Sequence, residues 1–158
     1  MEYLELYDEN KNKLNKIIPR GQKPLDGEHI LISLIFIKNS DGKFLIQKTS
    51  KEKGSKYSST GGHVLANEDS LTAITRELLE ELSFKVNKNE LKYLGSTLLG
   101  TPIFDVYYLK KDIDLSTLLL QKEEVESVLY MEKEEIFKLI YDENIIKSHG
   151  ILFQKYFK

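Results

Sequence analysis

The chain has 158 residues and a mass of 18.3 kDa, and 41% of its residues are hydrophobic and 30% charged. This length favours one globular domain over residues 1–158, with a substantial core. The net charge of −2 gives no general attraction to duplex nucleic acid, and no apolar run reaches the ~18 residues of a membrane helix. The acidic, aromatic start of the chain lacks a signal-peptide pattern, so we expect a cytoplasmic protein.

Short apolar runs separated by turn residues predict strands along the first part of the chain. Tyr3–Tyr7 ends at the turn signal Asp8-Glu9-Asn10, and Leu14–Ile18 is expected to return as the second strand of a hairpin. Ile30–Ile37 is a nearly continuous run of β-branched and aromatic residues, which is typical of a strand that is buried on both faces.

A turn at Ser40-Asp41-Gly42 leads into a further predicted strand at Phe44–Ile46. Lys48–Ser59 is polar and has no periodicity, so we expect a long surface loop there. Binding residues often lie in such loops.

Leu71–Leu82 has the spacing of an amphipathic helix. Its apolar side chains recur every three or four residues, at Leu71, Ile74, Leu78 and Leu82. Three residues before or at its start have side chains that favour the N-cap, namely Asn67, Asp69 and Ser70.

The remaining pattern predicts three strands and then two helices. Strands are expected at Leu91–Leu99, Phe104–Leu109 and Val125–Met131, and helical spacing follows in Glu132–Tyr141 and Ile145–Phe157. This order of elements predicts an α/β protein of the α+β type, in which helices cover a mixed sheet.

Three carboxylates lie on one face of the predicted helix Leu71–Leu82. At 3.6 residues per turn, Glu77, Glu80 and Glu81 fall within an arc of about 100°, on a different side from the apolar residues. Ala73 lies beside them, and we expect its small side chain to leave room for a ligand. Like charges at this spacing repel, and a hard cation such as Mg²⁺, or alternatively Mn²⁺, removes that penalty. Taken alone, an acidic helix face is more often simply solvated surface.

The surrounding residues make the functional interpretation stronger. The segment Gly61–Phe84, GGHVLANEDSLTAITRELLEELSF, resembles the Nudix box, the signature of the Nudix (MutT-like) hydrolase family. The resemblance rests on the spacing of Gly62, Glu68, the run Arg76–Glu81 and the apolar Phe84. It implies the Nudix fold, a mixed sheet sandwiched between helices.

The resemblance also implies roles for individual residues. Glu77, Glu80 and Glu81, together with the backbone carbonyl of Gly61, correspond to the metal ligands of the family. Arg76 is expected to brace the helix together with Glu68 and to orient the acids. The resemblance further implies an Mg²⁺-dependent enzyme that hydrolyses a diphosphate linkage in a nucleotide-like small molecule.

Two positions depart from the usual box. Ser83 occupies the position of a glycine just past the helix end, where a left-handed backbone is common. Asn67 replaces another frequent glycine, and asparagine tolerates a left-handed backbone better than most residues.

Outside the box, the outline of the chain resembles a branch of Nudix proteins related to isopentenyl-diphosphate isomerase. Those enzymes carry a cysteine at the position of Gly61, whereas this chain contains no cysteine at all. Isomerisation by proton transfer therefore loses its acid, but hydrolysis does not. An isomerase is accordingly the weaker alternative, and a non-catalytic Nudix module that binds a nucleotide is another.

Several acidic residues are candidates for the general base. Glu80 and Glu81 are candidates on the helix, while Glu123, Glu124 and Glu126 precede a predicted strand. Glu124 best resembles a recurring family acid because a valine follows it, although a solvated acidic loop is an equally good interpretation.

Two further residues are candidates for contacts with substrate. Tyr57 has a ring that can stack on a base, and His63 stands next to Gly62 at the mouth of the expected site. An aromatic is more often a packing residue, and the three histidines do not have a metal-ligand spacing. Neither the substrate nor the oligomeric state, monomer or homodimer, follows from the sequence.

Overall fold

The computed structural model describes residues 1–158 and contains every strand and helix that the sequence predicts. The strands are β1 (Tyr3–Tyr7), β2 (Lys13–Pro19), β3 (Ile30–Lys38), β4 (Phe44–Thr49), β5 (Tyr57–Ser58), β6 (Thr60–His63), β7 (Lys92–Leu98), β8 (Pro102–Lys110) and β9 (Val125–Met131). The α-helices are α1 (Ser70–Leu82), α2 (Lys133–Tyr141) and α3 (Lys147–Phe157). Short 3-10 helices are η1 (Lys51–Lys53), η2 (Lys88–Glu90) and η3 (Leu115–Thr117).

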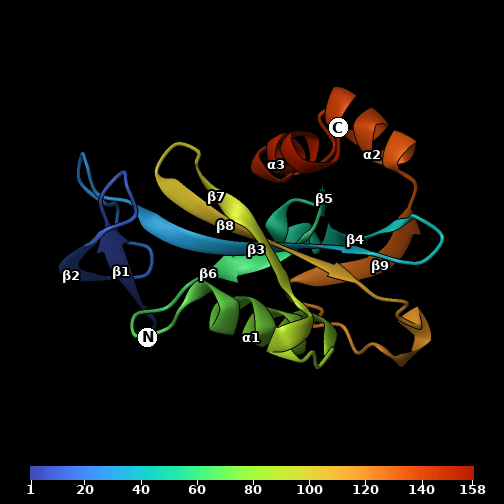
Figure 1. The fold of residues 1–158 in the computed structure, drawn as a ribbon, viewed down its shortest axis with the longest axis horizontal. Coiled ribbons are helices and arrows are strands. Elements are labelled where there is room, and N and C mark those ends of the chain that lie inside the picture. The colour runs from blue at the N-terminus through green and yellow to red at the C-terminus, as the bar shows by residue number, and fades with distance from the viewer.

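Seven strands form one mixed sheet, in the order β5-β4-β3-β8-β7, with β6 also paired to β3 and β9 to β4. Strands β3 and β8 run parallel along their whole length, and the other pairs are antiparallel. Strands β1 and β2 form a separate antiparallel hairpin, as predicted. Figure 1 shows this hairpin to one side of the main sheet.

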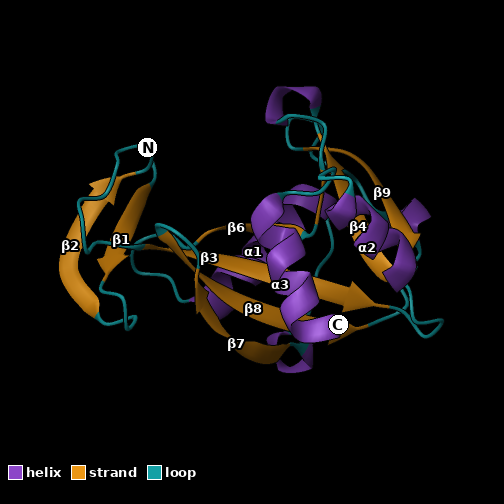
Figure 2. Ribbon diagram, turned by 90° about the horizontal axis from the view of Figure 1, so that it is seen from above, coloured by secondary structure: helices purple, strands orange, loops and turns teal.

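Helices cover both faces of the sheet. Figure 1 shows α1 on one face and α2 with α3 on the other, and Figure 2 gives the view from above. The predicted α+β arrangement, a mixed sheet between helices, is therefore confirmed. None of the helices is long and apolar enough to cross a membrane.

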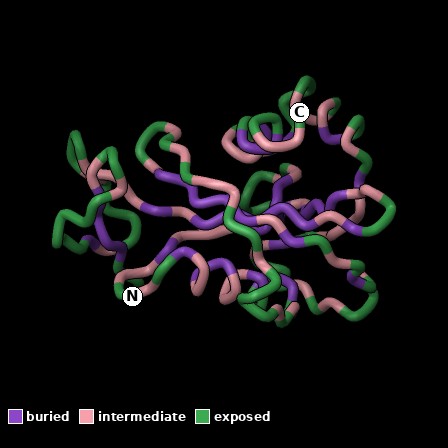
Figure 3. The backbone as a smooth tube through the Cα atoms, in the orientation of Figure 1, coloured by how far each residue is buried: buried purple, intermediate pink, exposed green.

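The alternation of side chains along β3 explains this layering. Leu34 and Phe36 point into a core shared with α2 and α3, whereas Ile35 and Ile37 point into a core shared with α1. All four are buried, and Figure 3 shows buried backbone running through the central strands. A strand that is covered on both faces needs apolar residues at every position, which is why the sequence pattern is continuous rather than alternating.

The site-bearing strand β6 lies where β3 and β4 separate. Residues of β3 and β4 pair only at Lys38 and Phe44, after which β4 pairs with β9. Strand β6 takes the released edge of β3, from Ile32–His63 to Ile35–Thr60. Helix α1 packs directly over β6, so the strand carries its residues beneath the helix.

Local chemistry fixes both ends of α1. Asp69 is the N-cap, and its Oδ1 accepts a hydrogen bond of 2.7 Å from the Thr72 N–H. Ser83 ends the helix in the left-handed region, with φ 56° and ψ 32°, and its N–H donates to the carbonyls of Leu78 and Leu79. Asn67 is left-handed too, with φ 68°. Both positions thus adopt the backbone that makes glycine common there.

The predicted surface loop Lys48–Ser59 is wrong at both ends. Lys48 and Thr49 extend β4, and Tyr57 and Ser58 form β5. The small polar side chains at both ends of the segment are buried. The Ser50 hydroxyl donates to the Glu123 carbonyl over 2.8 Å, and the Thr49 hydroxyl accepts from the Lys56 N–H over 2.9 Å, whereas the buried Ser59 hydroxyl has no partner. Absence of apolar periodicity therefore did not imply exposure here.

Candidate active site

The three carboxylates of α1 face the glycines of β6. Glu77, Glu80 and Glu81 line a cavity of about 220 Å³ together with Gly61 and Gly62. A second cavity, of about 350 Å³, adjoins the first. Both are lined by the same five residues along their common boundary, namely Arg20, Gly61, Gly62, Glu81 and Glu124.

The three acids differ in their surroundings. Glu81 is only 8% exposed, and its Oε1 accepts a hydrogen bond of 3.1 Å from the Gln47 amide. The hydroxyl of Thr60 holds that amide from the other side by donating to Gln47 Oε1. The Glu77 side chain is 13% exposed, whereas that of Glu80 is 46% exposed and lies toward solvent.

Burial makes the Glu77 and Glu81 carboxyls poor anions when no cation is near. Burial raises the pKa of Glu77, and the Arg76 guanidinium offsets part of that shift. Burial, followed by the neighbouring Glu77 carboxyl, raises the pKa of Glu81 well above its ordinary value. The Glu77 carboxyl raises the proton affinity of Glu81 beside it, and such a pair of largely covered carboxyls forms a site where a divalent cation can replace a proton.

The donor set fits a hard divalent cation. Carboxylate and carbonyl oxygens are the ligands that Mg²⁺ and Mn²⁺ prefer. No group of three acidic or histidine side chains is gathered in ligand positions. Arg76 Nη1 lies 2.9 Å from Glu77 Oε1 and 3.2 Å from Glu80 Oε1, and of the three acids only Glu77 and Glu81 are largely covered. Glu77 and Glu81 therefore form the core of the candidate site.

Both glycines of β6 are required by close packing. A Cβ at Gly62 would overlap the Glu77 carboxylate, so the absence of a side chain there makes room for a ligand residue. A Cβ at Gly61 would lie 2.6 Å from the backbone oxygen of Ser33. The backbone thus leaves no space at position 61 for the cysteine of the isomerases.

Arg76 is saturated with hydrogen bonds. Its Nε and Nη2 donate to the two oxygens of Glu68 over 2.9 Å each, and Nη2 also donates to the His63 carbonyl over 3.0 Å. Nη1 donates to Glu77 over 2.9 Å and to Glu80 over 3.2 Å. The hydrogen bonding of Arg76 to Glu68 is the largest of the causes that raise the pKa of Arg76. The side chain thus ties the loop before α1 to two of the three acids.

Of the later acids, Glu124 alone reaches the site. It lines both cavities, and its carboxylate lies 3.5 Å from the Lys53 ammonium. The Gln121 N–H donates to the Glu81 carbonyl over 2.9 Å, which fastens this segment to the end of α1. Glu123 and Glu126 line neither cavity, and Glu126 pairs instead with Lys48 at 3.7 Å.

The two predicted substrate contacts lie in different places. His63 lines the 350 Å³ cavity, and its pKa is lowered by burial and by the nearby Arg20 guanidinium. Tyr57 lines neither cavity, because the pairing of β5 with β4 turns its ring toward the core beneath α2 and α3 and toward the Lys48 ammonium. The structure does not bring Tyr57 to the acids.

Ala73 does not leave room for a ligand, contrary to expectation. It is fully buried in a small core with Tyr7, Leu31, Val64 and Ile103. Its methyl group fits where the N-terminal hairpin and α1 meet, so its small size serves packing.

Several residues of the site escaped the sequence analysis. Gln47 is an amide directly after the apolar run Phe44–Ile46, and Arg20 is one of only two arginines beside 21 lysines. These two anomalies were the available signals. The larger cavity also takes Ser58, Ser59, Ser148 and His149 from segments whose approach depends on the tertiary fold.

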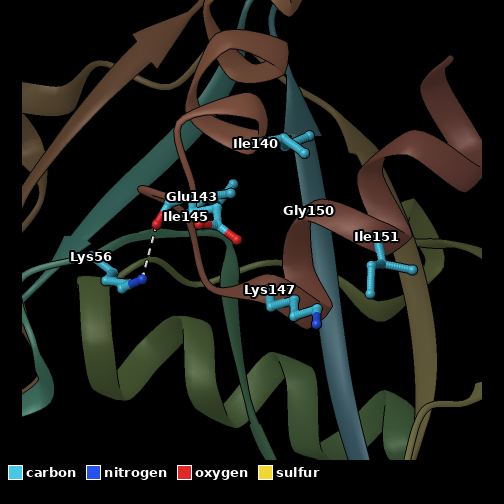
Figure 4. A pocket seen from close by; sticks show the side chains of 7 residues that line it. All are labelled: Lys56, Ile140, Glu143, Ile145, Lys147, Gly150 and Ile151. Carbon is cyan, nitrogen blue, oxygen red and sulfur yellow. Dashed lines mark hydrogen bonds between the residues drawn. The ribbon is translucent and has the colours of Figure 1, made fainter.

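A third cavity, of about 390 Å³, is separate from the acids. Figure 4 shows Ile140, Ile145 and Ile151 around it, with Lys56 and Lys147 at its edge. The Lys56 ammonium donates to the Glu143 carbonyl over 2.9 Å. This cavity contains none of the predicted site residues.

Comparison with known proteins decides the family. A model described as NUDIX domain matches residues 28–149. The chain belongs to the Nudix family. It is 35% identical over 129 residues to an uncharacterized Nudix hydrolase of Listeria monocytogenes, a match that covers 79% of this chain and 76% of the relative. As a homologue of Nudix hydrolases, it is an enzyme of that hydrolase class.

Solved Nudix structures share the fold. A Deinococcus radiodurans protein superposes with a TM-score of 0.85 and 20% identity, over 99% of this Nudix chain and 100% of that chain. A MutT protein from Methanosarcina mazei gives a TM-score of 0.65 and 19% identity, over 84% and 95% of the two chains. None of these matches selects the isomerase-like branch, which stays a prediction.

Proposed function

We propose that this Nudix protein is a Mg²⁺-dependent pyrophosphohydrolase that splits the diphosphate linkage of a nucleoside diphosphate joined to another group, or of a related nucleotide. The observation that carries this proposal is the pair of Glu81, which is buried, and Glu77, whose side chain is only 13% exposed; Glu77 faces Gly62, and Glu81 lies at the boundary of two cavities. Such a pair has a strong requirement for a cation and adjoins space for a substrate.

Glu77, Glu80, Glu81 and the Gly61 carbonyl would hold the cation. When bound, the cation supplies stabilisation of the negative charge that develops on the phosphoryl oxygens. Arg76 keeps Glu77 and Glu80 within reach of each other, and Gln47 orients Glu81 through its amide. Mn²⁺ suits the same oxygen donors.

We assign to Glu124 the role of the general base, which accepts a proton from the attacking water. Glu124 lines both cavities, is 40% exposed on its side chain and has Lys53 beside it. A carboxylate that reaches the cavity can accept a proton from a water molecule there. Glu80 and Glu81 are alternatives for this role, because both line the same cavity.

We propose that the part of the substrate beyond the diphosphate binds in the 350 Å³ cavity. Only Ile32, Phe104 and Ile146 among its 16 lining residues are hydrophobic, but carbon atoms make up most of its exposed wall, so it suits a group with polar edges and apolar faces. We propose that a small molecule binds there, with His63 at the wall, and that the domain comprises residues 1–158 and acts in the cytoplasm as a monomer or homodimer.

A metabolite screen tests the proposal. Purified protein with Mg²⁺ is incubated with a panel of diphosphate-containing nucleotides, and the products are identified by mass spectrometry. We expect a nucleoside monophosphate or related phosphate from at least one compound, and no product in a chelator. Ligand-induced stabilisation without turnover would instead support a nucleotide-binding module. Conversion of isopentenyl diphosphate would support the isomerase alternative.

A further inference from the structure

Arg20 belongs to a part of the chain that the family model does not include. It follows Pro19, the last residue of β2, whereas the matched region begins at residue 28. Nevertheless Arg20 lines both cavities, beside Gly61, Gly62, Glu81 and Glu124. The N-terminal hairpin therefore contributes a cation to the boundary where the acids are.

The hairpin holds Arg20 in place through its backbone. The Arg20 N–H donates to the Glu2 carbonyl over 2.9 Å, and Pro19 pairs with Tyr3. The Tyr3 carbonyl in turn accepts from the Ala66 N–H over 2.8 Å, which fastens the hairpin to the loop that leads into α1. The position of the Arg20 backbone is thus fixed relative to the metal-ligand helix.

The two arginines of the chain differ in their free donors. Every nitrogen of the Arg76 guanidinium donates to the protein, so that side chain has no donor left for a ligand. Arg20 donates only through Nη1, to Glu2 over 2.6 Å, and its Nε and Nη2 have no partner within the chain. The Arg20 side chain is 47% exposed, so a ligand in the cavities can reach these groups.

The choice of residue type points the same way. The chain uses 21 lysines and two arginines, and both arginines line the 220 Å³ cavity. A guanidinium presents a planar fork of donors that matches two oxygens of a phosphoryl group, which an ammonium does not. A surface ion pair with Glu2 alone contributes little to stability and does not require arginine.

We infer that Arg20 binds non-bridging oxygens of the substrate diphosphate, opposite the acids of α1, and that the N-terminal hairpin is part of the active site. This inference rests on the proposed function for the nature of its ligand, a diphosphate. Glu2 then keeps the guanidinium oriented over the cavity while the remaining donors bind phosphoryl oxygens.

Calorimetry with methylenediphosphonate, a diphosphate that cannot be hydrolysed, tests the inference in the presence of Mg²⁺. Loss of charged hydrogen bonds is expected to weaken binding by about 10- to 100-fold in Arg20→Ala. Arg20→Lys should recover only part of the loss, because it restores charge without the fork. Arg20→Gln provides a second uncharged variant, and thermal unfolding of each variant verifies that it is folded.

Lys16→Ala is the matched control. Lys16 lies on β2, the strand that leads to Arg20, is equally exposed at 47% and pairs with Glu28 at the same distance of 2.6 Å, but it lines neither cavity. We expect it to bind the diphosphonate as the wild type does. Equal binding by Arg20→Ala and the wild type would overturn the inference, as would an equal loss in Lys16→Ala.

Measuring hydrolysis as well as binding distinguishes a failure of this inference from a failure of the proposed function. If the wild type hydrolyses a diphosphate while Arg20→Ala binds the analogue normally, the inference fails and the function stands. If binding depends on Arg20 but no panel compound is hydrolysed, the inference stands and the proposed hydrolysis fails. A wild type that neither binds nor hydrolyses a diphosphate contradicts both.

Discussion

The guanidinium of Arg76 binds the carboxylate of Glu68 through two hydrogen bonds of 2.9 Å, one from Nε and one from Nη2. Glu68 also accepts from the Leu65 N–H over 2.9 Å, so the same carboxylate orders the loop between β6 and α1. The conformation of this loop determines where the glycines of β6 lie relative to the acids of α1. The pair is thus a brace for the site rather than a surface ion pair.

Arg76→Lys tests this brace. Lysine keeps the charge but loses the fork that binds Glu68, so we expect the free energy of unfolding to fall by about 1–3 kcal/mol. Hydrolysis should fall by about 10- to 100-fold, since ligand support is lost. Lys111→Gln removes an exposed pair with Glu90 at 2.8 Å and should change stability by less than about 1 kcal/mol. Wild-type activity and stability in Arg76→Lys would show that no brace exists.

Substitution of the two glycines of β6 should separate activity from stability. An added methyl group at Gly62 meets the movable end of the Glu77 side chain, whereas one at Gly61 meets the Ser33 backbone. We therefore expect Gly62→Ala to keep its melting temperature and lose at least about 10-fold in hydrolysis. Gly61→Ala should lower the melting temperature itself. Thermal unfolding and steady-state rates measure both, and the reverse pattern would refute the packing argument.

Ser83→Gly should stabilise the protein. Ser83 has φ 56°, a left-handed backbone that costs a residue with a side chain about 1 kcal/mol, whereas glycine adopts it freely. We expect the free energy of unfolding to rise by about 0.5–1 kcal/mol, and Ser83→Ala to give no gain. Urea unfolding of the three proteins provides the values. A loss of stability on Ser83→Gly would mean that the hydroxyl, not the backbone, decides this position.

The pH dependence of stability should contain a contribution from His149. Its Nδ1 accepts from the Ser59 N–H over 3.1 Å, and burial lowers the pKa of His149 to about 4 from 6.5. The unfolded chain therefore binds a proton at a higher pH than the folded chain does, so stability falls as the pH drops from 6.5 toward 4. Below that window this residue causes no further loss.

Urea unfolding between pH 7.5 and pH 4 checks this expectation with His149→Gln as the comparison. Glutamine does not titrate, so the variant should lose less stability than the wild type across the window. The other ionisable groups are present in both proteins, so their contributions to the pH dependence cancel in the difference. Parallel curves for the two proteins would contradict the assigned role of His149.

Local patterns predicted the helices and strands well, and they placed the three carboxylates of α1 on one face. The apolar spacing of α1 and the continuous run in β3 report burial directly, because periodicity reflects which faces of an element are covered. Asp69 was one of three N-cap candidates, and the resemblance to the Nudix box placed Ser83 just past the end of the helix. Glu77, Glu80 and Glu81 required only helix geometry to be placed on one face.

The remaining site depends on strand register and on contacts distant in sequence. Arg20 reaches the acids because the hairpin is fastened at Ala66, and no local pattern encodes that contact. The polar neighbours of Tyr57 predict an exposed ring, yet the pairing of Tyr57 with Lys48 turns this ring away from the site. Ala73 illustrates the converse, because a small residue beside acids proved to be a core residue.

The most direct test of the central claim compares Glu81→Gln with the wild type on the best substrate of the panel, with Mg²⁺. Glutamine preserves shape and the contact with Gln47 but cannot hold the cation as a carboxylate does, so hydrolysis should fall by about 10²-fold or more. Glu134→Gln, an exposed acid of α2, is the control and should retain the wild-type rate. A Glu81→Gln protein that hydrolyses at the wild-type rate would contradict the assignment of the site.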